Sequence, residues 1–172
     1  MSEYQFYEFF ALDRHLTEDE MEEMRAISTR GEITPSSFKN VYNYGDFGGN
    51  PETWMERYFD AFLYLANWGS RWVMLKLPLS VVSERDVEAY LSGEYSSYWT
   101  HEDHLILSFR YDAEDYDGEW VEGDGWLNSI VPLREALIRG DKRCLYLAWL
   151  LDHRWCFEDD DDPETEPPVP PG

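Results

Sequence analysis

The last fifteen residues of this chain are not expected to pack, so they set the C-terminal limit of the folded domain. Residues 158–166 contain seven acids and no base, and residues 167–172 read Pro-Pro-Val-Pro-Pro-Gly. The acids repel one another, and the prolines fix an extended backbone that lacks ladder donors. We therefore expect one folded domain over residues 1–157. An acidic, proline-rich, disordered linker or tail follows over 158–172 and is expected to lead into a further C-terminal region.

Hydrophobic periodicity and turn residues predict a chain in which strands and helices are interleaved. The strands are expected at about 4–12, within 33–44, and at 71–77, 95–99 and 104–111. The helices are expected at about 18–29, 51–66, 83–91, 125–139 and 142–157. This pattern predicts a single α+β domain with a mixed or antiparallel sheet and two helices at its C-terminal end. The opening strand–helix–strand leaves a ferredoxin-like half as one option.

Local signals support two of the helix starts. Thr17 and Glu20 form a capping-box pattern, and Asn50 followed by Pro51 is typical of a helix N-cap and first turn. The helix from Pro51 to about residue 66 is inferred from an apolar stripe spaced by four, four and three residues, formed by Trp54, Tyr58, Phe62 and Leu65. The last helix is apolar on much of its circumference, so we expect it to be central.

The formal charge of −22 is unevenly distributed. Residues 112–124 hold seven acids, residues 158–166 hold seven more, and neither segment contains lysine or arginine. The rest of the chain contains 22 acids and 14 bases, which gives it a net charge of −8. Direct binding to nucleic acid or to an anionic membrane is not expected, because both would repel this chain. A protein partner is expected instead, and the 8 Trp and 12 Tyr provide anchors of the kind found at interfaces.

The two cysteines predict free thiols. Cys144 and Cys156 fall in one predicted helix, where twelve residues separate them by about 18 Å, too far for a disulfide. No signal peptide and no apolar run near 18 residues is recognisable in the sequence. We therefore expect a cytoplasmic protein.

The acidic segment 112–124 is the first candidate for chemistry. Asp115, Asp117 and Glu119 surround a glycine in a pattern similar to the oxygen-rich core of calcium loops. An EF-hand is disfavoured, because Ala113 stands where its first ligand should be. A weakly bound calcium or magnesium ion and a solvated loop without a metal remain open, and no other cofactor is expected.

Other site motifs are weaker. His101 and His104, or His153 and Cys156, have spacings that could contribute to zinc binding, although they fit no standard zinc pattern. The sequence contains no Gly-x-Ser-x-Gly, Walker or Gly-x-Gly-x-x-Gly motif. A second cluster of polar residues lies among bulky rings and predicts either structural ion pairs or a small positive pocket; its members are Arg57, Asp60, Asn67 and Arg71.

Three stretches resemble a family of bacterial proteins known from uncharacterised open reading frames. They are YEF at 7–9 with ALDR at 11–14 and LT at 16–17; YFDAFLYLANWG at 58–69; and GWL at 125–127, PLR at 132–134, RGD at 139–141, LYL at 145–147 and WL at 149–150. The segment PPVPPG at 167–172 resembles that family's linker, after which members continue into a further helical segment. The resemblance implies a truncated bacterial protein, and it carries no known activity and no catalytic residue.

The leading hypothesis is a non-catalytic, acidic protein-interaction module of a bacterial protein. It would bind a basic or aromatic-accepting protein partner. The expected interaction residues are Asp112, Glu114, Glu122, Asp124, Trp120 and Trp126. Two alternatives remain open: a mimic of nucleic acid that occupies a partner's nucleic-acid-binding groove, and a divalent-metal-dependent enzyme that uses the carboxylates of 112–124.

Overall fold

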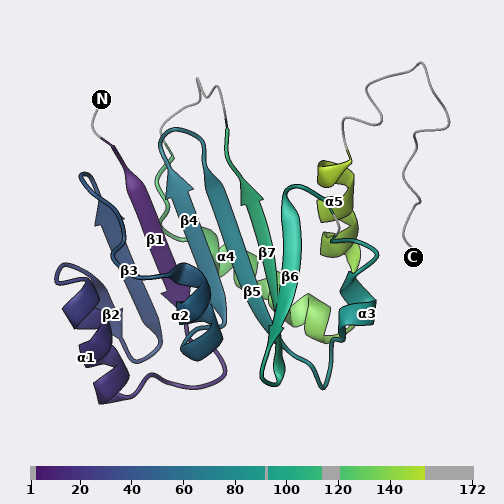
Figure 1. Ribbon diagram of the computed structural model, residues 1–172, viewed down its shortest axis with the longest axis horizontal. Coiled ribbons are helices and arrows are strands. Elements are labelled where there is room, and N and C mark those ends of the chain that lie inside the picture. The colour runs from purple at the N-terminus through teal and green to yellow at the C-terminus, as the bar shows by residue number, and fades with distance from the viewer. Residues whose placement is uncertain (1–2, 92, 114–120, 154–172) are drawn as a thin grey trace.

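A seven-stranded antiparallel sheet is the framework of the molecule, which we describe from a computed structural model (Figure 1). The structure describes residues 3–91, 93–113 and 121–153. The strand order is β2-β3-β1-β4-β5-β7-β6. The strands are β1 (Gln5–Phe10), β2 (Glu32–Thr34), β3 (Ser37–Tyr42), β4 (Ala61–Ala66), β5 (Arg71–Pro78), β6 (Ser96–His101) and β7 (His104–Tyr111). The helices are α1 (Glu18–Ile27), α2 (Pro51–Arg57), α3 (Glu84–Val87), α4 (Trp126–Ile138) and α5 (Arg143–Asp152).

The first four strands and two helices form a ferredoxin-like unit. The β1–α1–β2 crossover skips β3, and the β3–α2–β4 crossover skips β1, because the order at this end of the sheet is β2-β3-β1-β4. Every neighbouring pair among these strands is antiparallel. This is the split βαβ connectivity, used twice. The expected ferredoxin-like half is therefore present, and the arrangement extends to all of residues 5–66.

The remaining strands widen the sheet beyond β4, and the helices cover it from both sides. In Figure 1, α1 and α2 lie in front of the sheet and α4 lies behind it, with α3 and α5 at the β6 side. Two helices therefore close the described part of the chain, as expected for this α+β domain.

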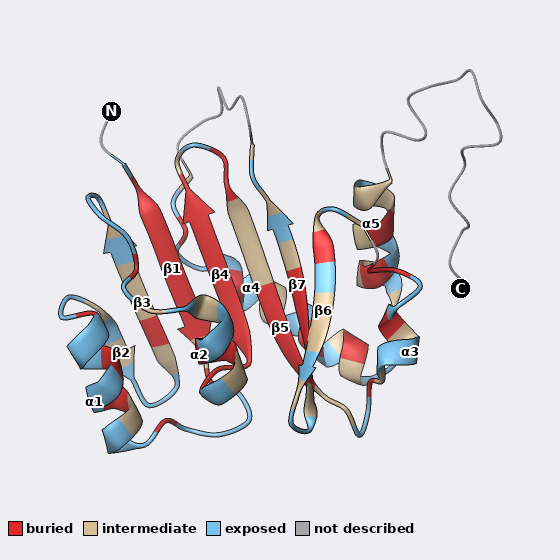
Figure 2. Cartoon of the chain, in the orientation of Figure 1, coloured by how far each residue is buried: buried red, intermediate tan, exposed pale blue. Residues whose placement is uncertain are grey.

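Two hydrophobic cores share the sheet. The core in front is rich in rings and packs α1 and α2 against Phe9, Phe38 and Phe62. The core behind is mainly aliphatic and packs α3, α4 and α5 against residues such as Leu63 and Leu105. Figure 2 shows β1 and β4 as almost continuously buried strands, because both of their faces are covered.

The predicted helix at 51–66 is wrong in its second half. The cap at Asn50 and the first turn at Pro51 are confirmed, but α2 ends at Arg57, and Ala61–Ala66 is the central strand β4. The spacing of its rings is compatible with a helical stripe. Every residue of β4 is nevertheless buried, which is the pattern of a strand covered on both faces.

Other differences are smaller. The strand expected within 33–44 is a hairpin of β2 and β3. The helix α3 has only four residues, and α5 ends at Asp152, before the predicted end at 157. The helix α5 is also peripheral, since Leu147 is 64% exposed while Leu145 and Trp149 are buried. The capping box of Thr17 and Glu20 is confirmed.

Candidate functional site

A groove rich in aromatic residues opens on the front face of the sheet, beyond the N-terminal end of α2. In Figure 1 it corresponds to the upper ends of β1, β4, β5 and β7, in front of which no described helix lies. Its volume is about 350 Å³. The rings that line it are Tyr7, Phe47, Tyr64, Trp68 and Trp72. The polar side chains that line it are Gln5, Asp46, Ser70, Arg110 and Asp112. We call these ten residues the aromatic groove.

The floor of the groove is a row of cross-strand neighbours. Tyr7 on β1 pairs with Tyr64 on β4, Tyr64 pairs with Trp72 on β5, and Trp72 pairs with Arg110 on β7. Residues that are direct neighbours across an antiparallel sheet point to the same face. The register therefore places two phenols, an indole and a guanidinium side by side, although they come from four strands.

A single amide holds the two tyrosines in place. The Gln5 Oε1 accepts a hydrogen bond from the Tyr64 hydroxyl at 2.9 Å and from the Tyr7 hydroxyl at 3.4 Å. The Gln5 Nε2 donates to the carbonyl oxygen of Gly45 and to Asp46 Oδ1. Burial raises the pKa of Tyr64 to about 12, and nearby carboxylates add to the rise. Burial likewise raises the pKa of Tyr7, so both phenols stay protonated near neutral pH.

The rim of the groove is polar and more exposed. Trp68 is 40% exposed and donates from Nε1 to Ser70 Oγ. The Arg110 Nε donates to Asp112 Oδ2 at 2.8 Å. Burial works against ionisation of Asp112, but hydrogen bonds from Arg110 and Ser70 outweigh it and hold the pKa of this carboxyl below its ordinary value.

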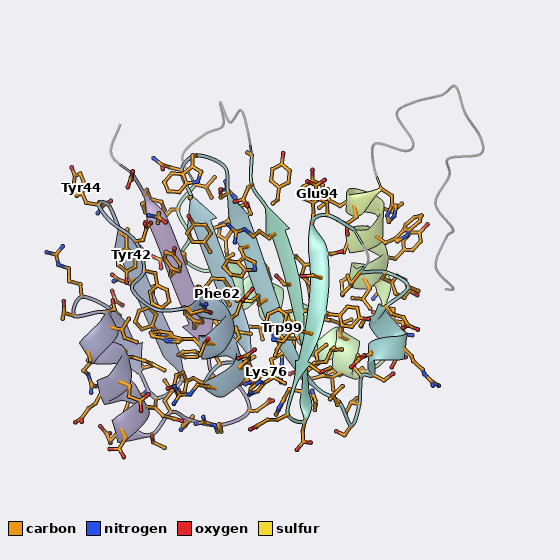
Figure 3. The ribbon with its side chains drawn as sticks, in the orientation of Figure 1. Tyr42, Tyr44, Phe62, Lys76, Glu94 and Trp99 are labelled. Carbon is orange, nitrogen blue, oxygen red and sulfur yellow. The ribbon has the colours of Figure 1, made fainter. Side chains whose placement is uncertain are left out.

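A second hollow of about 560 Å³ lies between the end of α1 and strand β3. Asp46 lines both hollows, so they meet at the loop that follows β3. Tyr44 in that loop is 84% exposed and is labelled at the upper left of Figure 3. In the second hollow the side chains of Asn40 and Tyr42 both hydrogen-bond to Ser28 Oγ, and Tyr42 and Tyr44 are the aromatic residues that line it, against five rings in the aromatic groove. We therefore take the aromatic groove as the candidate site, with Tyr44 as a neighbouring exposed ring.

The predicted interaction residues do not gather at one place. Asp112 lies on the rim of the aromatic groove. Asp124 instead pairs with Lys39 at 3.1 Å. Trp126 begins α4, which packs on the opposite face of the sheet, and Glu122 is exposed in the segment before that helix. Among the predicted interaction residues that the structure describes, Asp112 is therefore the one that lines the aromatic groove.

The other predicted residues of this segment lie outside the described part of the chain: Asp115, Asp117 and Glu119 as metal ligands, and Glu114 and Trp120 as interaction residues. Their roles stay predictions. Among the described residues, no group of three His, Cys, Asp or Glu side chains is arranged to hold a metal ion.

The two histidine pairs stand in different surroundings. His101 Nδ1 lies 3.8 Å from Glu56 Oε2, and His101 is the cross-strand neighbour of His104. A ring nitrogen of His153 lies 2.8 Å from the Trp149 carbonyl oxygen, and the ring stacks on Trp149. Cys156 lies outside the described residues.

Buried charges near α2 have structural partners. Lys76 Nζ lies 3.4 Å from Asp60 Oδ1 and donates to the Met55 carbonyl oxygen. Asp60 Oδ2 accepts from the backbone N–H groups of Leu12 and Asp13. Burial lowers the pKa of Lys76, and Asp60 offsets part of the effect. The pair joins β5, α2 and the end of β1, which fits the predicted structural role of Asp60.

Most of the aromatic groove was not anticipated from sequence. Four of its residues lie in segments that were expected to be strands: Gln5, Tyr7, Trp72 and Arg110. Tyr64 lies in a segment that was expected to be helical. Their alternation within β1, β5 and β7 indicates which residues share a face. It does not indicate which strands are neighbours, and the groove depends on that order.

The sequence and fold of the chain were compared with known proteins. No protein-family model, no curated protein and no solved structure matches. None of the helices in the described part of the chain has the length and hydrophobicity needed to span a bilayer.

Proposed function

We propose that this chain is a non-catalytic protein-interaction module that binds a basic segment of a partner protein in the aromatic groove. The observation that carries the proposal is the row of rings on the floor of the groove, bordered by the carboxylates of Asp46 and Asp112. The partner's basic side chains would meet the carboxylates, and its apolar groups would pack on the rings.

The rings of the groove suit protein recognition. Tyr and Trp supply a large contact area with few rotatable bonds, which lowers the entropic cost of binding. Gln5 fixes the two tyrosines through hydrogen bonds, so the floor is preorganised. Trp68 at the rim of the groove and Tyr44 beyond it add exposed rings to the aromatic surface.

Charge favours a basic partner. The chain has a net charge of −22, and the described residues of the groove include two carboxylates and one guanidinium. Such a surface repels nucleic-acid backbones and anionic membranes and attracts cationic segments during encounter.

The chemistry of the groove supports binding over catalysis. Among the described residues that line it, there is no histidine and no cysteine. Its two tyrosines have raised pKa values and are therefore poor nucleophiles and poor general bases near neutral pH. Asp112 accepts a hydrogen bond from Arg110, which stabilises its ionised form, and Asp46 accepts one from Gln5.

A matched pair of tryptophan variants tests the proposal. Trp68 borders the groove and is 40% exposed, whereas Trp126 is 44% exposed on the opposite side of the sheet. We would titrate the chain with octapeptides rich in lysine and arginine, with acidic octapeptides for comparison, and follow the tryptophan indole N–H resonances. Trp68→Ala should weaken binding of the basic peptides about tenfold, the effect of a typical anchor residue. Trp126→Ala should leave it within about twofold.

Two results would reject the proposal. One is equal weakening by both variants, which would place binding outside the groove. The other is failure of every basic peptide to bind the wild-type chain at millimolar concentration.

A further inference from the structure

The aromatic groove already contains a cation that belongs to the chain itself. The Arg110 guanidinium carbon lies 4.9 Å from the centre of the Trp72 ring, in the geometry of a cation–π contact. The same guanidinium donates from Nε to Asp112 Oδ2 at 2.8 Å. An indole face and a carboxylate thus hold one guanidinium between them at the rim of the groove.

The platform beneath this guanidinium is firmly placed. Trp72 Nε1 donates to Ser108 Oγ at 2.8 Å, and the indole packs edge-on against the buried Phe62 ring at 5.2 Å (Figure 3 labels Phe62). Asp112 accepts a hydrogen bond from Arg110, and Ser70 helps to hold the pKa of this carboxyl below its ordinary value. The indole therefore keeps its position without help from Arg110.

Arg110 itself is loosely held. The side chains of Arg110 and Asp112 are 55% and 53% exposed. Ion pairs and cation–π contacts at such exposed positions contribute little stability, because water and salt compete with them. A second guanidinium can replace the first at small cost, while the indole face stays in place.

We infer that the groove binds an arginine side chain of the partner, on Trp72 and against Asp112, in the position that Arg110 now occupies. This inference rests on the proposed function and adds the identity of the anchoring side chain. Arginine is favoured over lysine because its planar guanidinium stacks on an indole and pairs with a carboxylate at the same time. Arg110 acts as an internal competitor that lowers the affinity for the incoming arginine.

The inference predicts that removing an arginine strengthens binding. The probe is the peptide acetyl-Gly-Gly-Arg-Gly-Gly-amide, with citrulline in place of arginine as an uncharged peptide of nearly the same shape. Arg110→Met should bind the arginine peptide about fivefold more tightly than the wild type, since the competing contacts are lost. The citrulline peptide should bind weakly to every variant.

Arg57→Met is the matched control. Arg57 has the same exposure of 55%, lies 4.6 Å above the Tyr58 ring, and pairs with Glu23, but it does not line the aromatic groove. This substitution removes the same charge and a similar ring contact. It should leave the affinity for the arginine peptide within about twofold of the wild type, since only long-range electrostatics changes.

The outcomes separate this inference from the proposed function. Equal affinities for Arg110→Met and Arg57→Met, equal binding of the arginine and citrulline peptides, or an equal gain for a lysine peptide would each overturn the inference. Binding of basic peptides that depends on Trp68 would then still support the proposed function. If no basic peptide binds any of these variants, both fail.

Discussion

Glu8 is a buried carboxyl group on the rear face of β1, with only 7% of its surface exposed. Within the described residues its Oε2 has no hydrogen-bond partner. Burial raises its pKa from 4.5 to about 7, with Lys39 opposing the rise and Asp124 adding to it. The folded state therefore binds this proton more tightly than the unfolded state. The stability that this group contributes is present in full below about pH 4.5 and is lost as the pH rises to about 7.

Glu8→Gln should consequently stabilise the protein only at neutral and alkaline pH. We expect a gain of about 3 kcal/mol in the free energy of unfolding at pH 8 and no difference from the wild type at pH 4. Urea denaturation across this pH range measures the effect. The neighbouring Glu32→Gln is the control, because the Glu32 side chain is 75% exposed and its substitution should have little effect. A gain from Glu8→Gln that is equal at pH 4 and pH 8 would contradict the assignment.

The buried pair of Asp60 and Lys76 leads to a second prediction. Asp60→Ala leaves a buried ammonium group without its counter-charge and removes the acceptor for two backbone N–H groups. We expect a loss of about 3–5 kcal/mol in the free energy of unfolding. Lys76→Met should cost less, because Asp60 keeps its two amide donors. Chemical denaturation of both variants gives the order, and a larger loss for Lys76→Met would reject this account.

At the scale of elements, the segment 121–125, which precedes α4, contacts residues at the start of β1. Gly123 packs on the buried Phe6 ring, and its N–H faces the Tyr4 hydroxyl at 3.4 Å. Asp124 pairs with Lys39 on β3. The contacts hold residues more than 80 positions apart in the sequence.

Gly123→Ala tests how tightly this segment packs. A Cβ at this position would lie 2.3 Å from Phe6 Cδ1, so the ring or the segment must move. We expect a loss of about 1–3 kcal/mol in the free energy of unfolding, as for other overpacked sites. Gly48→Ala is the control, since the nearest atoms to its added Cβ are 3.6 Å away. Thermal denaturation that finds both variants equally stable would show that the packing is loose.

At the scale of the whole molecule, two cores depend on one sheet. Rings from β1 and β4 pack against α1 and α2 in front, and Phe6 of β1 with aliphatic residues of β4 packs against α4 and α5 behind. Both cores pack on the same strands, so loss of one core would also disrupt the strands on which the other core packs. We therefore expect the described part of the chain to unfold in one cooperative step.

The net charge of −22 makes that step sensitive to salt. Like charges repel one another in the compact state, and added salt screens the repulsion. We expect the free energy of unfolding to rise by about 1 kcal/mol, or the Tm by about 2–4 °C, between low ionic strength and about 0.3 M NaCl. KCl should have the same effect if screening is the cause. A calorimetric Tm that stays constant or falls would contradict this expectation.

Much of the fold was predictable because its signals are local. The capping box at Thr17, the cap at Asn50 and the strands predicted at 71–77 and 104–111 all follow from neighbouring residues. The α+β class followed from the order of these elements. The helix predicted over 61–66 was wrong, because a strand buried on both faces has no alternation to distinguish it from a helix.

The amino-acid sequence by itself determined the local elements, the fold class and the acidic charge, since each depends on composition or on residues a few positions apart. Only the tertiary structure decided where the candidate site lies. Tyr7, Tyr64, Trp72 and Arg110 span more than 100 residues of chain and become neighbours through the strand order β1-β4-β5-β7 and its register. Strand order and register arise from the packing of the whole sheet, so a local reading of the chain does not contain them.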